Sequence, residues 1–440
     1  MFVHYFDLAL RSLRRNKVLT ALMVLAIAVG IGASMTMLTV MHVLSGDPLP
    51  GRSGQLYHPQ VNPTLPPRFQ SGPISAMDYR SATDLWGAHR AERQALIANG
   101  SVRVNLPESG QPPLARQLLL TTSEFFPMFD VPFRYGGGWS ASDETSHARV
   151  AVISAELNQR LFGGADSVGR SLRLNGSEVR IAGVLEHWRP APRFYDVWSG
   201  RYLKGRTSSL YQAAEDVYLP IFTGLDMFAP MELPVHFCWA DGTKITSMQS
   251  APCSWISLWV QLSGTEAVRD YQRFLDGYVQ QQKQAGRYQG EQTWLPDLMQ
   301  WVEWNHVVPG NVRMQAWMAV AFLLICLINT MCLLLSKFLR RSGEIGVRRA
   351  MGASRRTVFA QCLVEAGVIG LAGGIVGWLL TLLGLWLVRR QPEAYADLAH
   401  LDLPMLVGTF VLAVVASLLA GVLPALRASR VPIGLQIKTL

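Results

Sequence analysis

The stretch VLTALMVLAIAVGIGASMTMLTVMHVL, from Val18 to Leu44, is 27 residues long and contains no Asp, Glu, Lys or Arg. A helix of about 20 residues crosses roughly 30 Å of hydrocarbon, so this run is long enough to span a membrane. Basic residues precede it, as in a signal peptide. A signal peptide, however, has an apolar region of only about 7 to 15 residues, and no small-x-small cleavage pattern precedes Asp47. We therefore predict that the run stays as a membrane anchor.

Three further apolar runs are long enough to span a membrane: Met314 to Ser336, Val358 to Val388 and Met405 to Leu423. The third of the four runs contains one acid, Glu365, which we expect near the lipid headgroups. Half of the 440 residues are hydrophobic and 16% are charged, a composition typical of a chain that is part membrane protein and part soluble domain. The predicted fold is thus four transmembrane helices plus a mixed α/β extracytoplasmic domain inserted between helices 1 and 2.

The distribution of Lys and Arg predicts the orientation, because cytoplasmic loops carry an excess of basic residues. Fourteen basic residues lie before the first run, between the second and third, and after the fourth, whereas the loop between the third and fourth has only two. Both termini are therefore expected in the cytoplasm, with the long stretch from Ser45 to Arg313 on the other side. That stretch has 24 basic and 25 acidic residues, so the net charge of +9 belongs to loops that face anionic membrane lipids. It does not indicate a nucleic-acid partner.

The five cysteines fit this arrangement. Cys326, Cys332 and Cys362 fall within predicted membrane helices, where a thiol is a small apolar group. Cys238 and Cys253 lie 15 positions apart in the exported stretch, where an oxidising compartment would allow a disulfide. Two unpaired thiols are the alternative. No Cys/His spacing predicts a metal site.

The exported stretch contains signals for both strands and helices. A β-rich run, Val150 to Ser154, precedes a helical pattern with Leu157 and Leu161 on one face. Asn175-Gly176 then separates two short alternating runs, which is a strong hairpin signal. A second helical pattern covers residues 267–282.

Motifs for catalysis are missing from the sequence. None of the six lysines follows a glycine, so the Walker A pattern GxxxxGK[ST] does not occur, and neither HExxH nor GxSxG is present. We predict that this chain is not an enzyme and binds no cofactor of its own.

The most informative segment reads RRSGEIGVRRAMGASRRTVFAQCLVEAGVIGLAGGIVGWLL, residues 340–380. Its first part predicts a short amphipathic helix that ends at Gly352, followed by a basic turn into a glycine-bearing membrane helix. We expect Ile345, Val347, Ala350 and Met351 to form the apolar side of the short helix, opposite three charged residues, Glu344, Arg348 and Arg349. Such a helix should dock on lipid or on a partner.

Residues Glu344 to Ala353 closely match the EIGxRRAxGA signature of the MacB/FtsX-like permeases, the type VII ABC transporter permeases, which this chain resembles. The stretch LLTTSEFFPMFDVPFRYGGGWSASDE (119–144) and the segment around the hairpin resemble the MacB-type periplasmic core domain, and PALRASRVPIGLQIK resembles the family's C-terminal end. The resemblance weakens between residues 190 and 300. It also departs from the family after the Phe-x-Val-Pro stretch, where Gly136, Gly137, Gly138 and Trp139 stand in place of the frequent Gly-Arg. A fused nucleotide-binding domain, as in MacB, is not expected in this chain.

The resemblance implies mechanotransmission: a separate cytoplasmic ABC ATPase dimer, which binds ATP and Mg, pushes the short helix, and the first two membrane helices carry the motion to the periplasmic domain. The ATPase-coupling residues implied are Glu344, Ile345, Gly346, Val347, Arg348, Arg349, Ala350 and Gly352. A basic loop bound only to lipid is the alternative. Because an ABC ATPase works as a dimer, we expect two permease chains, either identical or paralogous.

The expected function is an efflux or export permease in the bacterial inner membrane, with a periplasmic adaptor (membrane-fusion) protein as a further partner. The alternative is a non-transporting, FtsX-like regulator of a periplasmic cell-wall hydrolase. The predicted segments are an amphipathic helix at the inner surface (1–17), transmembrane helix 1 (18–44), the periplasmic domain (45–313), helix 2 (314–336), the coupling helix (337–357), helix 3 (358–388), a short periplasmic loop (389–404), helix 4 (405–423) and the cytoplasmic tail (424–440). Small residues four apart, as in Gly373/Gly377, predict close helix packing within one subunit or across a dimer.

Overall fold

The structure is a computed structural model that describes residues 17–62, 76–107, 112–196, 206–228, 235, 237–238, 246–400 and 403–430. The amphipathic helix predicted for residues 1–17 lies outside these ranges, except for Lys17, as does the end of the tail. The chain divides into two compact units. One comprises the residues up to Ser45 and from Val308 onward, and the other runs from Gly46 to Val307.

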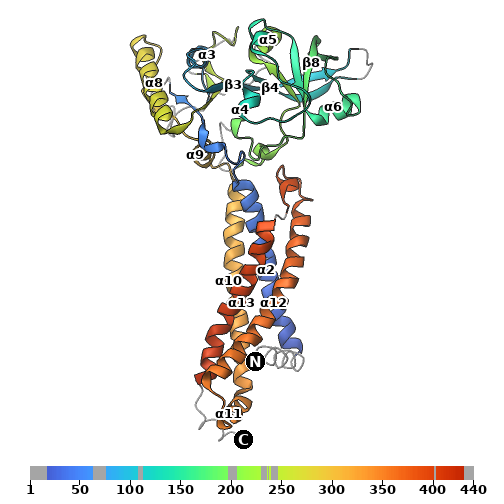
Figure 1. Cartoon of the computed structure of the whole chain (residues 1–440), viewed down its shortest axis with the longest axis vertical. Coiled ribbons are helices and arrows are strands. Elements are labelled where there is room, and N and C mark those ends of the chain that lie inside the picture. Colours follow the sequence, from blue (N-terminus) through green and yellow to red (C-terminus); the bar gives the residue numbers. More distant parts are fainter. Residues whose placement is uncertain are drawn as a thin grey trace. The chain divides into compact units, whose positions relative to one another are not determined.

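The first unit is a bundle of long helices (Figure 1). Its long helices are α2 (Lys17–Ser45), α10 (Gly310–Arg340), α12 (Arg355–Val388) and α13 (Leu403–Arg430), and its short ones are α11 (Ser342–Ala350) and η5 (Ala396–Leu398). Within the described residues, four helices are long and apolar enough to cross a membrane, which confirms the predicted number of transmembrane helices. The helices are longer than the apolar runs, and α10 begins at Gly310, because helical hydrogen bonding continues into the polar flanks.

Helix α2 packs closely against α12 through glycines. A Cβ atom added at Gly373 of α12 would lie 2.7 Å from Cγ2 of Ile27, and one at Gly377 would lie 3.1 Å from Cβ of Ile31. On the α2 side, a Cβ at Gly32 would lie 2.7 Å from Cβ of Leu380. The small residues of α12 are thus used within one chain, since their missing side chains let the two helices approach.

Several buried hydroxyl groups inside the bundle donate hydrogen bonds to backbone carbonyls. Ser34 of α2 donates through its hydroxyl to the carbonyl of Ala319 on α10, at 2.8 Å. The hydroxyls of Thr36, Thr330 and Thr381 each donate to the carbonyl four residues earlier in their own helix. This removes the cost of burying a hydroxyl among apolar side chains.

The second unit is a mixed α/β domain built on a nine-stranded sheet. The strands of this sheet are β1 (Leu56–Tyr57), β3 (Arg93–Asn105), β4 (Leu114–Thr121), β5 (Phe133–Gly136), β6 (Val150–Ile153), β7 (Ser171–Leu174), β8 (Ser177–Leu185), β9 (Val217–Pro220) and β12 (Ser257–Gln261). Their order is β1-β12-β3-β4-β9-β6-β8-β5, with β7 pairing to β3 and β8. The pairs β4/β9 and β6/β8 are parallel and the other pairs are antiparallel. A mixed α/β domain between the first two membrane helices was the predicted architecture, and it is confirmed.

Seven helices and two small sheets accompany the main sheet in the described part of this unit. The helices are α3 (Tyr79–Gly87), α4 (Phe125–Met128), α5 (Ala141–Thr145), α6 (Ala155–Phe162), α7 (Ile221–Met227), α8 (Gly264–Gln284) and α9 (Leu298–Trp304). Short 3₁₀ turns are η1 (Ser53–Gln55), η2 (Phe194–Asp196) and η3 (Ser208–Tyr211). The small sheets pair β10 (Phe237–Cys238) with β11 (Cys253–Ser254) and β2 (Gln60–Val61) with β13 (Thr293–Trp294).

The local predictions in this unit are confirmed. The strand at Val150 is β6, and Leu157 of α6 is buried in the core. The hairpin is the β7/β8 pair, in which Asn175 and Gly176 have positive φ angles of 48° and 90°. A two-residue turn with both φ angles positive matches the twist of the strands, and Asn-Gly adopts it most readily.

The departure from the family's Gly-Arg pattern has a packing explanation. Trp139 is 4% exposed, and its ring lies edge-on to Phe126 with ring centroids 4.9 Å apart. A Cβ at Gly138 would lie 2.7 Å from Cδ2 of the same Phe126. In this chain the position is therefore part of an aromatic core, and the glycine beside it makes room for the phenylalanine.

Cys238 and Cys253 form a disulfide. They are register partners across β10 and β11, so the bond joins two strands that are already paired. The disulfide joins the two strands that flank residues 239–252, within the region of residues 190–300 where the resemblance to the family weakens.

Candidate functional site: the helix between two membrane helices

The candidate site is built around α11, which joins α10 to α12. Arg341 follows the last residue of α10 and precedes the first of α11. After α11, Gly352 has φ +103°, a left-handed conformation that is strained for other residues. Ser354 then caps α12 by accepting a hydrogen bond from the backbone N–H of Thr357. Sequence-local features therefore set both ends of the short helix.

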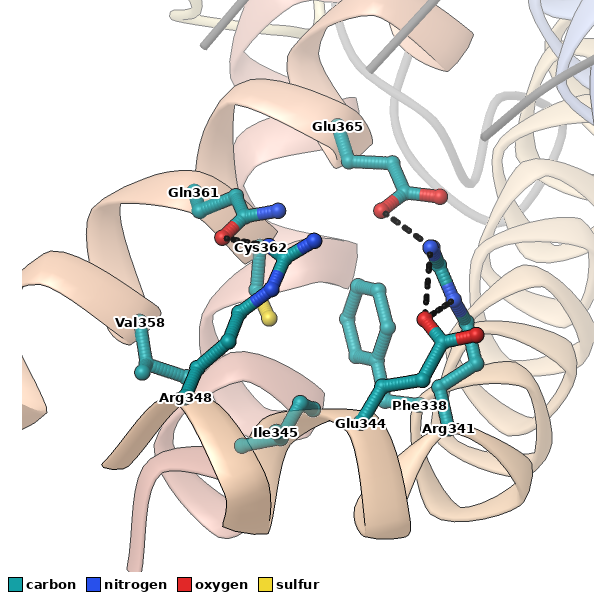
Figure 2. A pocket seen from close by; sticks show the side chains of 9 residues that line it. All are labelled: Phe338, Arg341, Glu344, Ile345, Arg348, Val358, Gln361, Cys362 and Glu365. Carbon is teal, nitrogen blue, oxygen red and sulfur yellow. Dashed lines mark hydrogen bonds and ion pairs between the residues drawn. The ribbon is translucent and has the colours of Figure 1, made fainter. Parts of the chain in front are cut away.

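One side of α11 is turned toward α12. Ile345 packs with the apolar core of the bundle, beside Phe338, Val358 and Cys362. Arg348, one turn further along, donates a hydrogen bond of 3.2 Å from Nη1 to Oε1 of Gln361 on α12 (Figure 2). Because residues three and four apart share a helix face, this side of α11 meets a matching face of α12.

A chain of ion pairs connects α10, α11 and α12. Nζ of Lys337 on α10 lies 2.6 Å from Oε1 of Glu365 on α12. The other carboxylate oxygen of Glu365 lies 3.6 Å from Nη1 of Arg341, whose Nη2 is 3.2 Å from Oε2 of Glu344 on α11. Figure 2 shows the Arg341 guanidinium between the two carboxylates. With two cations and two anions, this series of ion pairs has no net charge.

Two of the four residues in this series of ion pairs, Lys337 and Glu365, are almost fully enclosed. The side chains of Lys337 and Glu365 are 1% and 4% exposed, whereas those of Arg341 and Glu344 are 23% and 42% exposed. The place of Glu365 near the headgroups stays a prediction; its side chain points into the bundle and pairs with both cations. Its carboxylate faces two basic groups four residues apart, Lys337 near the end of α10 and Arg341 just after that helix.

The other side of α11 is exposed. Val347 is 52% and Met351 76% exposed, and Ala350 and Gly352 are also exposed. The sequence-based prediction placed Ile345 on one apolar side with Val347, Ala350 and Met351, and that assignment is wrong. At 100° per residue, Ile345 and Val347 lie on opposite faces, so the core takes Ile345 while the other three form a separate apolar strip.

The eight predicted coupling residues are therefore divided between two faces. Val347, Ala350, Gly352 and Glu344 are exposed, Ile345 and Gly346 are turned inward, and Arg348 and Arg349 are half-buried. The residues that sequence reasoning did not assign to the site are Lys337, Arg341, Gln361, Glu365 and, on the exposed strip, Met351. A signal for Glu365 was present, since a single acid within an apolar membrane run marks a functional or paired position, but it did not identify Lys337 as the partner.

The hollow enclosed by these residues is small. Its volume is about 30 Å³, lined by residues of α10, α11 and α12. That is enough for a water molecule but far below the roughly 300 Å³ at which small-molecule sites begin. The arrangement is thus suited to holding helices together and presenting a surface. Among the described residues, no group of three His, Cys, Asp or Glu side chains is placed to hold a metal.

A second buried charge cluster lies in the exported domain. Arg193 pairs with Glu215 at 2.9 Å and with Asp196 at 3.1 Å, and the hydroxyl of Tyr195 donates to Glu215 at 2.8 Å. Burial raises the pKa of Asp196 to about 7, against the opposing effect of the Arg193 guanidinium. Burial likewise raises the pKa of Tyr195, and the Glu215 carboxylate adds to that rise.

These features define a class: a polytopic membrane protein of permease type, with an extracytoplasmic α/β domain between the first membrane helix and the other three. A family model described as MacB-like periplasmic core domain matches residues 20–270, and one described as FtsX-like permease C-terminal matches residues 316–433. The first match covers more than half of the chain. The chain belongs to the MacB/FtsX-like family of ABC transporter permeases.

Three curated relatives illustrate the family. The Pyoverdine export ATP-binding/permease protein PvdT of Pseudomonas entomophila is 26% identical over 310 residues, which cover 70% of this chain and 40% of that protein. The Macrolide export ATP-binding/permease protein MacB of Wolinella succinogenes is 23% identical over 435 residues, covering 96% and 59%. The uncharacterized ABC transporter permease YvrN of Bacillus subtilis is 23% identical over 309 residues, covering 70% and 66%. This chain therefore spans about 40 to 66% of the length of these relatives.

Among solved structures, the periplasmic region of MacB from Actinobacillus actinomycetemcomitans aligns with 56% of this chain and 91% of that one. Its identity to this chain is 13% and the TM-score is 0.35. That score is too low to establish a shared fold, so the family models carry the assignment.

Proposed function

We propose that this chain is the permease subunit of an ATP-driven export system that works by mechanotransmission. A separate ABC ATPase dimer binds and hydrolyses ATP with Mg, contacts α11 from the cytoplasm, and moves it. The motion passes through α10 and α2 to the periplasmic domain, which acts on the exported substrate. Both termini and α11 lie in the cytoplasm, and the chain resides in the bacterial inner membrane.

The observation that carries this proposal is the two-sided character of α11. Its inner side is held to α12 by packing and hydrogen bonding, while Val347, Ala350 and Met351 form an exposed apolar strip. Exposed apolar side chains on a short helix are costly in water, so a covering partner is expected. Basic residues beside the strip, such as Arg349, suit a partner with acidic groups.

The descriptions of PvdT and MacB name export and pair an ATP-binding part with the permease part. For this chain we propose that the ATP-binding part is a separate protein that associates with the permease. These relatives give no support to the alternative of a non-transporting regulator of a cell-wall hydrolase. A second permease chain, membrane lipids and a periplasmic adaptor are further proposed partners.

The test is co-purification of the full-length chain from membranes of its host, followed by identification of bound ATPases and measurement of ATP hydrolysis. Val347→Asp with Met351→Asp places two carboxylates on the exposed strip, and we expect loss of the ATPase from the purified complex. Charge reversal at Arg349 is expected to weaken the same association. Arg348 is less suitable, because its reversal also breaks the hydrogen bond to Gln361.

The matched control is Arg355→Gln, an exposed basic residue at the start of α12, outside the strip. It should leave the ATPase bound. The proposal fails if no ABC ATPase accompanies the wild-type chain, or if the Asp variants retain it at the wild-type level.

A further inference from the structure

We propose that Glu365 is a positioning residue for the coupling helix: by holding Lys337 and Arg341 at once, it fixes α11 to α10 and α12 so that the three helices move as one body. That Glu365 attaches α11 to α10 and α12 concerns this chain alone. The role of that attachment in ATP-driven coupling rests on the proposed function.

The buried pair of Lys337 and Glu365 is not explained by its contribution to stability. Burying a Lys and a Glu at 1% and 4% exposure removes both from solvent, and the attraction between such charges does little more than offset that cost. Well-packed apolar residues in their place would be as stable or more so. A buried pair inside an apolar bundle therefore points to specificity of arrangement, which is its best-attested use.

The carboxylate of Glu365 is shared between two cations. Glu365 uses one oxygen for each cation, Oε1 toward Lys337 and Oε2 toward Arg341. Arg341, in turn, uses separate nitrogens for Glu365 and Glu344. Every link joins two different segments, because Lys337 is on α10, Arg341 at the junction with α11, Glu344 on α11 and Glu365 on α12. Two cations four residues apart would repel each other, and Glu365 lies where it offsets that repulsion.

A second contact, the hydrogen bond between Arg348 and Gln361, also attaches α11 to α12. Gln361, which accepts from Arg348, is one helical turn before Glu365 and on the same face of α12. Ile345 packs between the two polar links. Helix α11 is thus attached to α12 by a charged link near its first turn, an apolar contact and a neutral hydrogen bond. Lifting α11 away would leave the enclosed Glu365 with only one of its two cations.

These contacts determine how α11 responds to a push from the cytoplasm. A push on the exposed strip of α11 cannot be absorbed by a local tilt of the short helix without breaking the link between Arg341 and Glu365. The displacement is passed instead to α10 and α12. Removing the charge at residue 365 should release α11 while leaving its exposed strip intact.

The experiment is hydrogen-deuterium exchange on the full-length chain in lipid nanodiscs, comparing wild type with Glu365→Gln. We expect amides of residues 342–350 to exchange at least about tenfold faster in the variant, the change expected when a link worth 1.4 kcal/mol is lost. Amides of β3 and β4 in the exported domain should not change. Exchange in α11 at the wild-type rate would overturn the proposal.

Two more variants keep the test decisive. Arg341→Gln removes the same link from its more exposed end, so it serves where Glu365→Gln does not fold, and it should give the same faster exchange. Arg340→Gln is the matched control, since Arg340 is the exposed basic neighbour at the end of α10. It should exchange like wild type, and equal acceleration in both arginine variants would contradict the proposal.

The coupling role is read out separately from the same variants. In a complex purified with its ATPase, Glu365→Gln should keep the ATPase bound, because the exposed strip is unchanged, but should lose at least about tenfold in ATP-driven transport. Bound ATPase with normal transport would refute the coupling role. If wild type binds no ATPase, the proposed function fails, whereas the exchange experiment still decides whether Glu365 fixes α11.

Discussion

The contact between α2 and α12 allows a prediction in which two chemically identical substitutions have opposite effects. Gly373→Ala and Gly367→Ala lie six residues apart in the same helix. A Cβ at Gly373 would lie 2.7 Å from Cγ2 and 2.9 Å from Cβ of Ile27, whereas a Cβ at Gly367 has nothing within 4 Å. Carbon atoms in contact normally lie about 3.5 to 4.0 Å apart, so the first substitution requires the helices to shift by roughly 1 Å.

The magnitudes follow from two opposing effects. Replacing Gly by Ala within a helix stabilises it by about 0.8 to 1 kcal/mol. Overpacking a close contact costs about 1 to 3 kcal/mol. Gly367→Ala is therefore expected to raise the free energy of unfolding by up to about 1 kcal/mol. Gly373→Ala should lower it by up to about 2 kcal/mol, so that the two variants differ by about 1 to 3 kcal/mol.

The assay is reversible unfolding of the full-length chain by SDS in mixed micelles, followed by circular dichroism. Helix propensity acts equally at both positions, so it cancels from the difference between the variants, and only the contact with Ile27 remains. Equal unfolding free energies for the two variants would refute the reasoning that α2 and α12 pack through Gly373.

Further predictions concern the disulfide and the two buried charge clusters. Serine at both Cys238 and Cys253 should lower the stability of the exported domain by about 3 kcal/mol for a loop of this length, and thermal melts should then lose their sensitivity to reductant; continued sensitivity would argue against this bond. The raised pKa of Asp196 means that between about pH 4 and pH 7 the folded state holds a proton that the unfolded state has lost. This group's contribution to stability therefore falls as pH rises through that window. Asp196→Asn should flatten the pH dependence of the melting temperature there, and an unchanged slope would contradict the assignment. Finally, Lys337→Met alone should destabilise the bundle by about 3 to 5 kcal/mol, because Glu365 remains buried with a weaker partner set, whereas Lys337→Met with Glu365→Leu should recover most of that loss in the SDS assay. A double variant no more stable than the single one would count against the ion pair.

Much of the architecture could be predicted from local patterns. Apolar runs such as Val18 to Leu44 have few alternatives to a membrane helix, because the lipid interior requires all backbone groups to be paired within the segment. The Asn175-Gly176 hairpin is equally local, since the backbone conformation of two residues sets it. That α11 ends just before Gly352 was predictable for the same reason.

The sequence by itself determined the number of membrane helices, the place of the exported domain and the family, since each depends on residues close together in the chain. Only the tertiary structure decided which face of α11 is buried and where Glu365 points. Lys337 and Glu365 are 28 positions apart, and nothing local indicates that α10 and α12 bring them within 2.6 Å. Whether a charged residue meets lipid, water or an opposite charge depends on how helices pack, and that packing is set by contacts distant in sequence, such as Gly373 against Ile27.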